Sequence, residues 1–169
     1  MTEPSPNPGQ STPGRGLRIS VGVFAGMGAT GIAAFLGLVS TFTDSKGHLS
    51  TPSPLILIAP LVVVPGFAGA VLRGRAVVLA IMAGAVAAPM AAIVPIAVSC
   101  PSNLFAGIGM AAAYPALVIA GVAAFIGSEL GGSHWQGNHP RRDVMALMVV
   151  GVIGTIGWVP ALSSLGRCP

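Results

Sequence analysis

Charged side chains are scarce in this chain of 169 residues. Aspartate, glutamate, lysine and arginine together make up 7% of the sequence, whereas a soluble globular domain carries about 25%. Hydrophobic residues account for 53%, and the mean hydropathy is +0.85. A soluble fold of this length has no interior large enough to hide so much apolar surface. The composition therefore excludes an ordinary soluble domain and predicts a polytopic integral membrane protein.

Ionisable residues are missing altogether from the long apolar runs. The four acidic residues, the three histidines and the eight basic residues all lie in polar segments before, between or after these runs. Ionisable groups inside a bilayer are the usual mark of proton relays, ion pathways and counter-ions. The sequence also has no phosphate-cradling loop, no paired nucleophile and base, and no acidic dyad. We therefore expect a protein that is not an enzyme and that holds no cofactor.

Histidine gives only a weak indication of a metal site. His134 and His139 are five residues apart in the segment "SHWQGNHPRRD", which contains no cysteine. Structural zinc sites need four ligands, usually including cysteine, so the expected number of metal sites is none. The alternative is a solvated loop at the lipid headgroups, with a tryptophan anchor and arginines that meet anionic phosphates. The predicted headgroup contacts are Arg73, Arg75, Trp135, Arg141 and Arg142.

Apolar runs long enough to cross a bilayer occur five times. A helix rises ~1.5 Å per residue, so about 20 residues span a hydrocarbon core ~30 Å thick. Residues 1–16 are rich in proline and glycine and predict a disordered cytoplasmic tail. Residues 17–169 predict one all-α domain, a bundle of five transmembrane helices of which several are kinked by proline. The predicted spans are 19–42, 54–72, 76–99, 104–128 and 144–165.

The basic residues predict the orientation of this bundle. Five crossings place the N-terminal tail, the turn at residues 73–75 and the polar segment 129–143 on one side of the membrane. Six of the eight basic residues lie on that side, against Lys46 and Arg167 on the other. Because cytoplasmic loops are enriched in lysine and arginine, we expect the N-terminus in the cytoplasm and the C-terminus outside. The composition suggests a GC-rich genome, so the expected location is the bacterial inner (plasma) membrane.

A cleaved signal peptide is the alternative interpretation of the first run. That run has 24 residues, however, whereas the apolar region of a signal peptide usually has about 7–15. The tail before it is also long and rich in proline. We therefore expect an uncleaved first span.

Small residues recur at helical spacing in several of the predicted spans. Gly22 and Gly26 form a GxxxG motif that Thr30 continues four residues later. Such ridges let helix backbones approach closely, because packing rather than hydrophobicity drives helix association in lipid. We expect these contacts to be internal to the bundle, the alternative being a contact with another molecule. The first span lacks proline and is dense in glycine, so it is the best candidate for a ridge that faces outward.

Proline occurs in every predicted span after the first. Each proline removes an intrahelical hydrogen bond, and we expect a local helix break in "VVVPGFAG", where Gly66 follows Pro65. Gly69 in the same stretch leaves room for a neighbouring helix or a ligand. Broken helices form the binding sites of many transporters, so this feature bears on function.

Cysteine is nearly absent, with only Cys100 and Cys168 in the chain. Two predicted crossings separate these residues, so they lie on the same side of the membrane whether or not the first span is cleaved. Under the predicted orientation that side is the oxidising exterior, where disulfides persist. We expect a disulfide bond between them, the alternative being two unrelated small residues.

Two functions remain open after these exclusions. The first is a non-catalytic membrane subunit that packs against a larger membrane protein and supports its assembly, stability or lipid organisation. The second is a small homo-oligomeric transporter or channel for a neutral or lipid-like substrate. Its polar contacts would be Thr30, Ser99, Tyr114 and Thr155. Expected partners are membrane lipids and either a larger integral membrane protein or further copies of the chain, but not nucleic acid. The absence of ionisable groups from the spans favours the first function.

Overall fold

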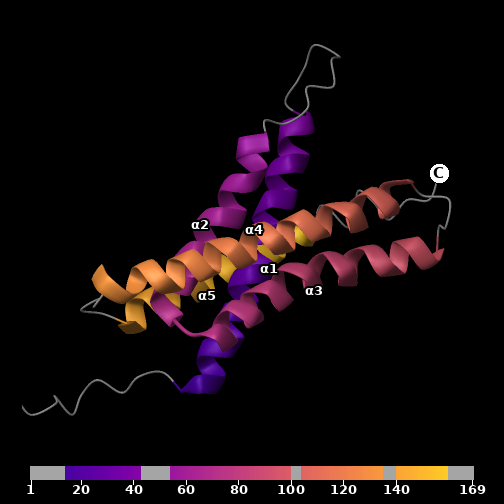
Figure 1. Cartoon of the computed structure of the whole chain (residues 1–169). Coiled ribbons are helices and arrows are strands. Elements are labelled where there is room, and N and C mark those ends of the chain that lie inside the picture. Colours follow the sequence, from indigo (N-terminus) through magenta and orange to yellow (C-terminus); the bar gives the residue numbers. More distant parts are fainter. Residues whose placement is uncertain (1–13, 43–53, 100–103, 135–139, 160–169) are drawn as a thin grey trace, which may run out of the picture.

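The computed structural model describes residues 14–42, 54–99, 104–134 and 140–159 (Figure 1). Within these ranges every regular element is an α-helix and there is no strand, so the predicted all-α class is confirmed for them. The helices are α1 (Arg15–Phe42), α2 (Pro54–Leu72), α3 (Arg75–Ser99), α4 (Leu104–His134) and α5 (Pro140–Ile156).

The helix bounds follow the predicted spans closely at α2 and α3 and less closely elsewhere. The bounds of α2 are those predicted, and α3 begins one residue earlier than predicted. In contrast, α1 begins four residues early, at Arg15, and α4 continues six residues past Ser128. The polar segment 129–143, expected as a loop, is therefore helical at both ends.

Local chemistry and one tertiary contact explain the later end of α4 and the earlier start of α5, which runs from Pro140 to Ile156 instead of over the predicted 144–165. Pro140 is the first residue of α5, where a missing backbone N–H removes no helical hydrogen bond. The Asp143 carboxylate lies in the first turn, near the positive end of the helix dipole. At the end of α4, the carbonyl oxygen of Gly131 accepts a hydrogen bond from the Arg73 guanidinium. This bond ties the last turns of α4 to the end of α2.

The local break expected at Pro65 is absent. Helix α2 is continuous from Pro54 to Leu72 and contains both Pro60 and Pro65, and α4 likewise continues through Pro115. The side chain of Pro65 is fully buried. Membrane helices tolerate proline where neighbouring helices support the segment, and α2 packs along α4 over this region. The expectation was therefore wrong because it considered α2 without its neighbour.

Helix α1 lies at the centre of the fold. It packs against α2, α3 and α5, while α4 packs against α2 and α3. Figure 1 shows α1 and α2 running together toward one tip of the molecule, and α3 and α4 running together toward another. The two pairs cross near the hairpin turn that joins α2 to α3.

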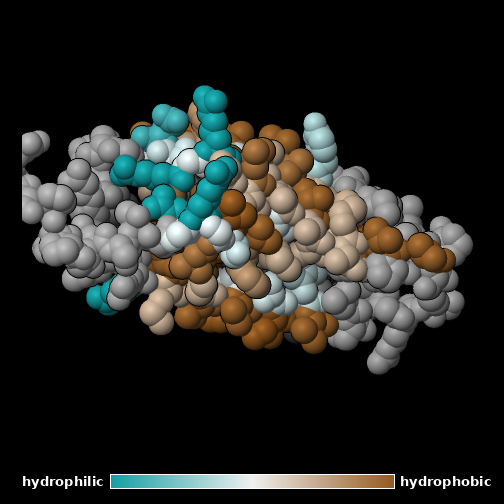
Figure 2. Space-filling model, turned by 90° about the horizontal axis from the view of Figure 1, so that it is seen from below, coloured by the Kyte–Doolittle hydropathy of each residue, from teal (hydrophilic) through white to brown (hydrophobic). Residues whose placement is uncertain are grey.

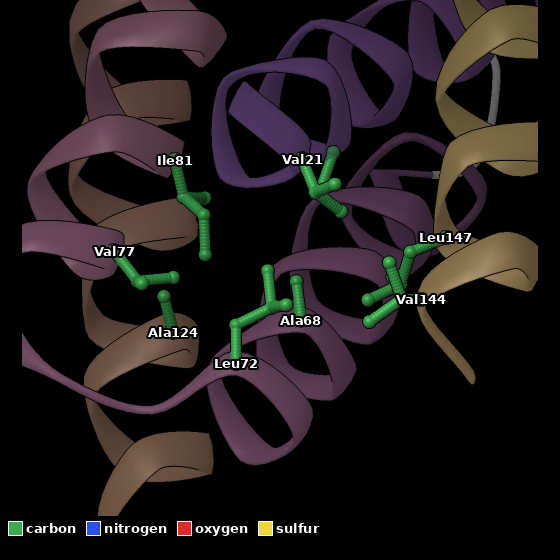
Figure 3. Packing of buried hydrophobic residues seen from close by; sticks show 9 residues of the cluster. Val21, Ala68, Leu72, Val77, Ile81, Ala124, Val144 and Leu147 are labelled. Carbon is green, nitrogen blue, oxygen red and sulfur yellow. The ribbon is translucent and has the colours of Figure 1, made fainter. Parts of the chain in front are cut away.

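The buried core lies beside that turn and draws on all five helices (Figure 3). Its members come from the N-terminal halves of α1, α3 and α5 and from the C-terminal halves of α2 and α4. These five helix ends therefore lie together at one end of the molecule, as they do when neighbours along the chain are antiparallel. The core residues are Val21, Ala25, Ala68, Leu72, Val77, Ile81, Ala124, Val144 and Leu147.

Three helical stretches are long and apolar enough to cross a membrane, namely Arg15–Ser40, Pro54–Leu72 and Ala113–Gly131. A shorter apolar stretch, Arg75–Ala91, belongs to α3. Large apolar side chains also face outward, as at Leu55, which is 75% exposed. In water such an apolar surface would favour aggregation, whereas in a membrane it contacts lipid. The length of the apolar helices and their exposed apolar side chains therefore indicate a transmembrane protein.

Candidate functional site: glycine seams and an arginine-rich end

Glycine mediates the closest contact between α1 and α3. A methyl group added at Gly26 would lie 2.7 Å from the amide nitrogen of Ala85 and 3.0 Å from the carbonyl carbon of Ile81, and it would overlap the Ile81 carbonyl oxygen. From the other helix, a methyl group at Gly84 would overlap the carbonyl oxygen of Val23. Only glycine permits this approach, because the atoms that it meets belong to backbone and cannot rotate away. We call this contact the α1–α3 seam.

A second seam joins α1 to α5 and consists of glycine facing glycine. A methyl group at Gly28 would lie 2.7 Å from the Cα of Gly151, and one at Gly31 would lie 2.7 Å from the carbonyl carbon of Gly154. A methyl group at Gly154 would in turn lie 2.6 Å from the carbonyl carbon of Gly28. The α1–α5 seam therefore brings two backbones into direct contact.

In the third contact, the α2–α4 seam, the two glycines predicted on α2 have different surroundings. A methyl group at Gly69 would lie 2.9 Å from the carbonyl carbon of Ala124, whereas one at Gly66 meets only the Ala123 carbonyl oxygen, at 3.6 Å. That second distance is ordinary van der Waals contact. Gly66 takes part through its backbone instead, because a methyl group at Gly127 would lie 2.8 Å from the carbonyl carbon of Gly66.

These seams place the GxxxG ridge of α1 inside the chain. Gly22 lies against α3, where an added methyl group would be 3.3 Å from the Val77 carbonyl oxygen, and Gly26 follows one turn later in the same seam. Thr30 is 6% exposed, and its hydroxyl is shared between the carbonyl oxygens of Gly26 (3.3 Å) and Met27 (3.0 Å). In this structure α3 covers the ridge at Gly22 and Gly26, which agrees with packing inside the bundle and not with a contact to another molecule.

Each polar side chain that was considered for a transport pathway and that the structure describes either bonds within its own helix or faces outward. The hydroxyl of Thr155 donates to the Val152 carbonyl oxygen of its own helix, at 2.8 Å, just as Thr30 bonds within α1. Tyr114 faces outward and is 71% exposed. The side chain of Ser99 lies outside the described part of the structure.

The turn between α2 and α3 has an unusual backbone. Arg73 has a φ of 47° and Gly74 a φ of 108°, and a non-glycine residue rarely adopts such a positive φ. Hydrogen bonds hold the turn, from the Arg73 amide to the Gly69 carbonyl (3.1 Å) and from the Val77 amide to the Gly74 carbonyl (2.9 Å). The guanidinium of Arg73 also donates to the Gly131 carbonyl near the C-terminus of α4, where the helix dipole favours a cation. These contacts offset the backbone strain at Arg73.

Arginine side chains gather at this end of the molecule, which we call the arginine-rich end. Figure 2 shows hydrophilic side chains (teal) concentrated over one end, while most of the other described surface in that view is hydrophobic. Two carboxylates lie at the same end, an exposed Glu129 and a half-buried Asp143. The exposed arginines are Arg15, Arg73, Arg75 and Arg142.

Several predicted site residues lie outside the described structure. The predicted disulfide partners Cys100 and Cys168 do so, as do Trp135 and the side chain of Arg141. The disulfide and these headgroup contacts therefore remain predictions. Among the side chains that are described, no group of three or more histidine, cysteine, aspartate or glutamate residues is placed to hold a metal ion.

A spacing of four residues indicates Gly151, paired with Thr155, as a small-residue contact, but it misses Gly154 and Gly157. Gly151, Gly154 and Gly157 recur every third residue in "GVIGTIG", and the four-residue spacing that was sought does not match this pattern. All three lie against α1. Trp158 follows them, and its ring lies beside Gly31, where an added methyl group would be 3.0 Å from Cδ1. Its Nε1 is buried without a hydrogen-bond partner among the residues that the structure describes.

Comparison with known proteins finds no relative of this chain. No protein-family model matches it, and neither a curated protein nor a solved structure is significantly similar.

Proposed function

We propose that this protein is a small, non-catalytic subunit of the membrane that packs against a larger membrane protein and supports it. One observation carries the proposal: the charged side chains that the structure describes lie at one end of the fold, and many bulky apolar side chains are exposed over the rest of it. Such a surface offers contacts to lipid and to other membrane helices, and it offers no acid, base or charged ligand to a substrate within the bilayer.

The proposed topology has five spans, with the N-terminus in the cytoplasm and the C-terminus outside. It is supported by the core, in which the N-terminal halves of α3 and α5 pack with the corresponding ends of α1, α2 and α4. Helices α1, α2 and α4 contain the three long apolar stretches. Because α3 and α5 pack antiparallel to their neighbours in the same bundle, we expect them to cross the membrane as well. The arginine-rich end then faces the cytoplasm, and the proposed location is the bacterial plasma membrane.

Purification of the tagged protein from its native membranes in a mild detergent tests the subunit proposal. We expect one larger membrane protein to remain bound at a fixed ratio through size-exclusion chromatography, because the apolar exterior is proposed to contact it. Membranes with the untagged protein control for nonspecific capture. A pure homo-oligomer that retains no other protein would overturn the proposal and favour the transporter alternative.

The proposed topology also predicts a disulfide between Cys100 and Cys168, because it places both residues at the outer boundary of the membrane. The loop-entropy model assigns about 4 kcal/mol to a bond that closes a loop of this length, and less is expected where inserted helices are already confined. Thiol labelling of the denatured, unreduced protein should find no free thiol in a chain that remains monomeric on a non-reducing gel. Two free thiols per chain would refute the bond.

A further inference from the structure

Arginines occupy helix ends where an arginine is electrostatically unfavourable. The N-termini of α1, α3 and α5 lie together at the arginine-rich end, and the first turns of α1 and α3 contain no acidic residue. Arg15 begins α1, Arg75 begins α3, and Arg142 lies in the first turn of α5. A helix N-terminus carries a partial positive charge and disfavours a neighbouring cation. At Arg15 and Arg75 the arginine and the dipole therefore add charge of the same sign, whereas in α5 the Asp143 carboxylate offsets part of the charge beside Arg142.

The described chain supplies too little negative charge to balance this end. The structure describes five arginine side chains, against the carboxylates of Glu129 and Asp143. Arg15, Arg75 and Arg142 are all exposed, so their guanidinium groups are accessible from outside. Arg73 differs from these three because its guanidinium is held on the Gly131 carbonyl. An external anion at this surface would interact favourably with both the arginine side chains and the positive ends of the helix dipoles.

The surroundings of these arginines indicate which anion is suitable. Exposed apolar side chains lie within one helical turn of them: Leu17 is 43% exposed, Leu79 is 65% exposed and Met145 is 66% exposed. A ligand at this border meets charge on one side and an apolar surface on the other. A phospholipid has this combination, and the planar guanidinium forms paired hydrogen bonds with a phosphate group.

We propose that the arginine-rich end is a binding surface for the headgroups of anionic phospholipids, with Arg75 and Arg142 as its principal contacts. The inference rests on the proposed placement of this end at the cytoplasmic face, and it requires no protein partner. Bound headgroups neutralise arginines that the helix dipoles otherwise disfavour, so the folded protein gains stability in a membrane that contains acidic lipid.

The test compares thermal unfolding of the purified full chain in two kinds of nanodisc, one of phosphatidylcholine alone and one that also contains phosphatidylglycerol. We expect the unfolding midpoint of the wild type to rise by several degrees with the acidic lipid. The double variant Arg75→Gln/Arg142→Gln should lose most of this rise. In phosphatidylcholine alone it should unfold at or above the wild-type midpoint, because it lacks two cations at helix N-termini. A variant that is simply destabilised would have a lower unfolding midpoint than the wild type in both kinds of nanodisc.

Two further measurements distinguish lipid binding at this end from a general effect of charge and from binding of free phosphate. Lys46→Gln/Arg167→Gln removes the same charge from the predicted opposite side and should keep most of the lipid-dependent rise. An equal loss in both double variants would overturn the proposed surface, as would identical wild-type midpoints in the two lipids. A full rise on adding inorganic phosphate to phosphatidylcholine discs would overturn the assignment to lipid. Because no protein partner is present, failure here leaves the subunit proposal untouched.

Discussion

Replacing Gly26 with alanine is expected to destabilise the folded protein while leaving its insertion into the membrane intact. The added methyl group would overlap the Ile81 carbonyl oxygen and lie 2.7 Å from the Ala85 amide nitrogen. Overpacking of this kind costs about 1–3 kcal/mol, because here the backbone of α1 or α3 must move. Insertion depends on the apolar length of α1, which a methyl group does not reduce. Thermal unfolding in detergent and recovery in the membrane fraction measure the two effects separately.

Gly16 is the matched control on the same helix, because nothing lies within 4 Å of a methyl group added there. Gly16→Ala should leave stability unchanged or raise it by up to about 1 kcal/mol, since alanine is the better helix former. Helix α2 offers a second matched pair, in which Gly69→Ala meets the Ala124 backbone and Gly66→Ala does not. Equal stability of the Gly26 and Gly16 variants would show that α1 and α3 are not in close contact.

The ends of a helix could be predicted from the sequence where they depend only on the length of the apolar run. The bounds of α2 are an example, because the apolar run ends at a turn that begins with Arg73. The ends of α1 and α4 depend on more. Helix α4 continues to His134, and the contacts that support this extension, from Gly131 to Ala70 and to the Arg73 guanidinium, join residues far apart in the chain.

The packing partners of the glycines could not be predicted from spacing. Gly22 and Gly26 indicated a ridge, but nothing local shows whether α3 or another molecule covers it. Gly154 and Gly157 were missed because they follow Gly151 at a spacing of three, which differs from the small-xxx-small pattern. The break expected at Pro65 shows the same limit, because the support that α4 gives to α2 is a tertiary property.

Reporter fusions test the central claim, a bundle of five transmembrane helices with its arginine-rich end in the cytoplasm. Fusions after Arg75, Ser102 and Arg167 follow two, three and five proposed crossings. Each truncated chain carries a reporter that is active on only one side of the membrane.

The five-span account predicts that the reporter after Arg75 lies in the cytoplasm and that those after Ser102 and Arg167 lie outside. The fusion after Ser102 is decisive for α3, because it changes sides only if α3 crosses. Reporters after Arg75 and Ser102 on the same side would contradict the crossing of α3. Reporters after Arg75 and Arg167 on the same side would contradict the five-span topology as a whole.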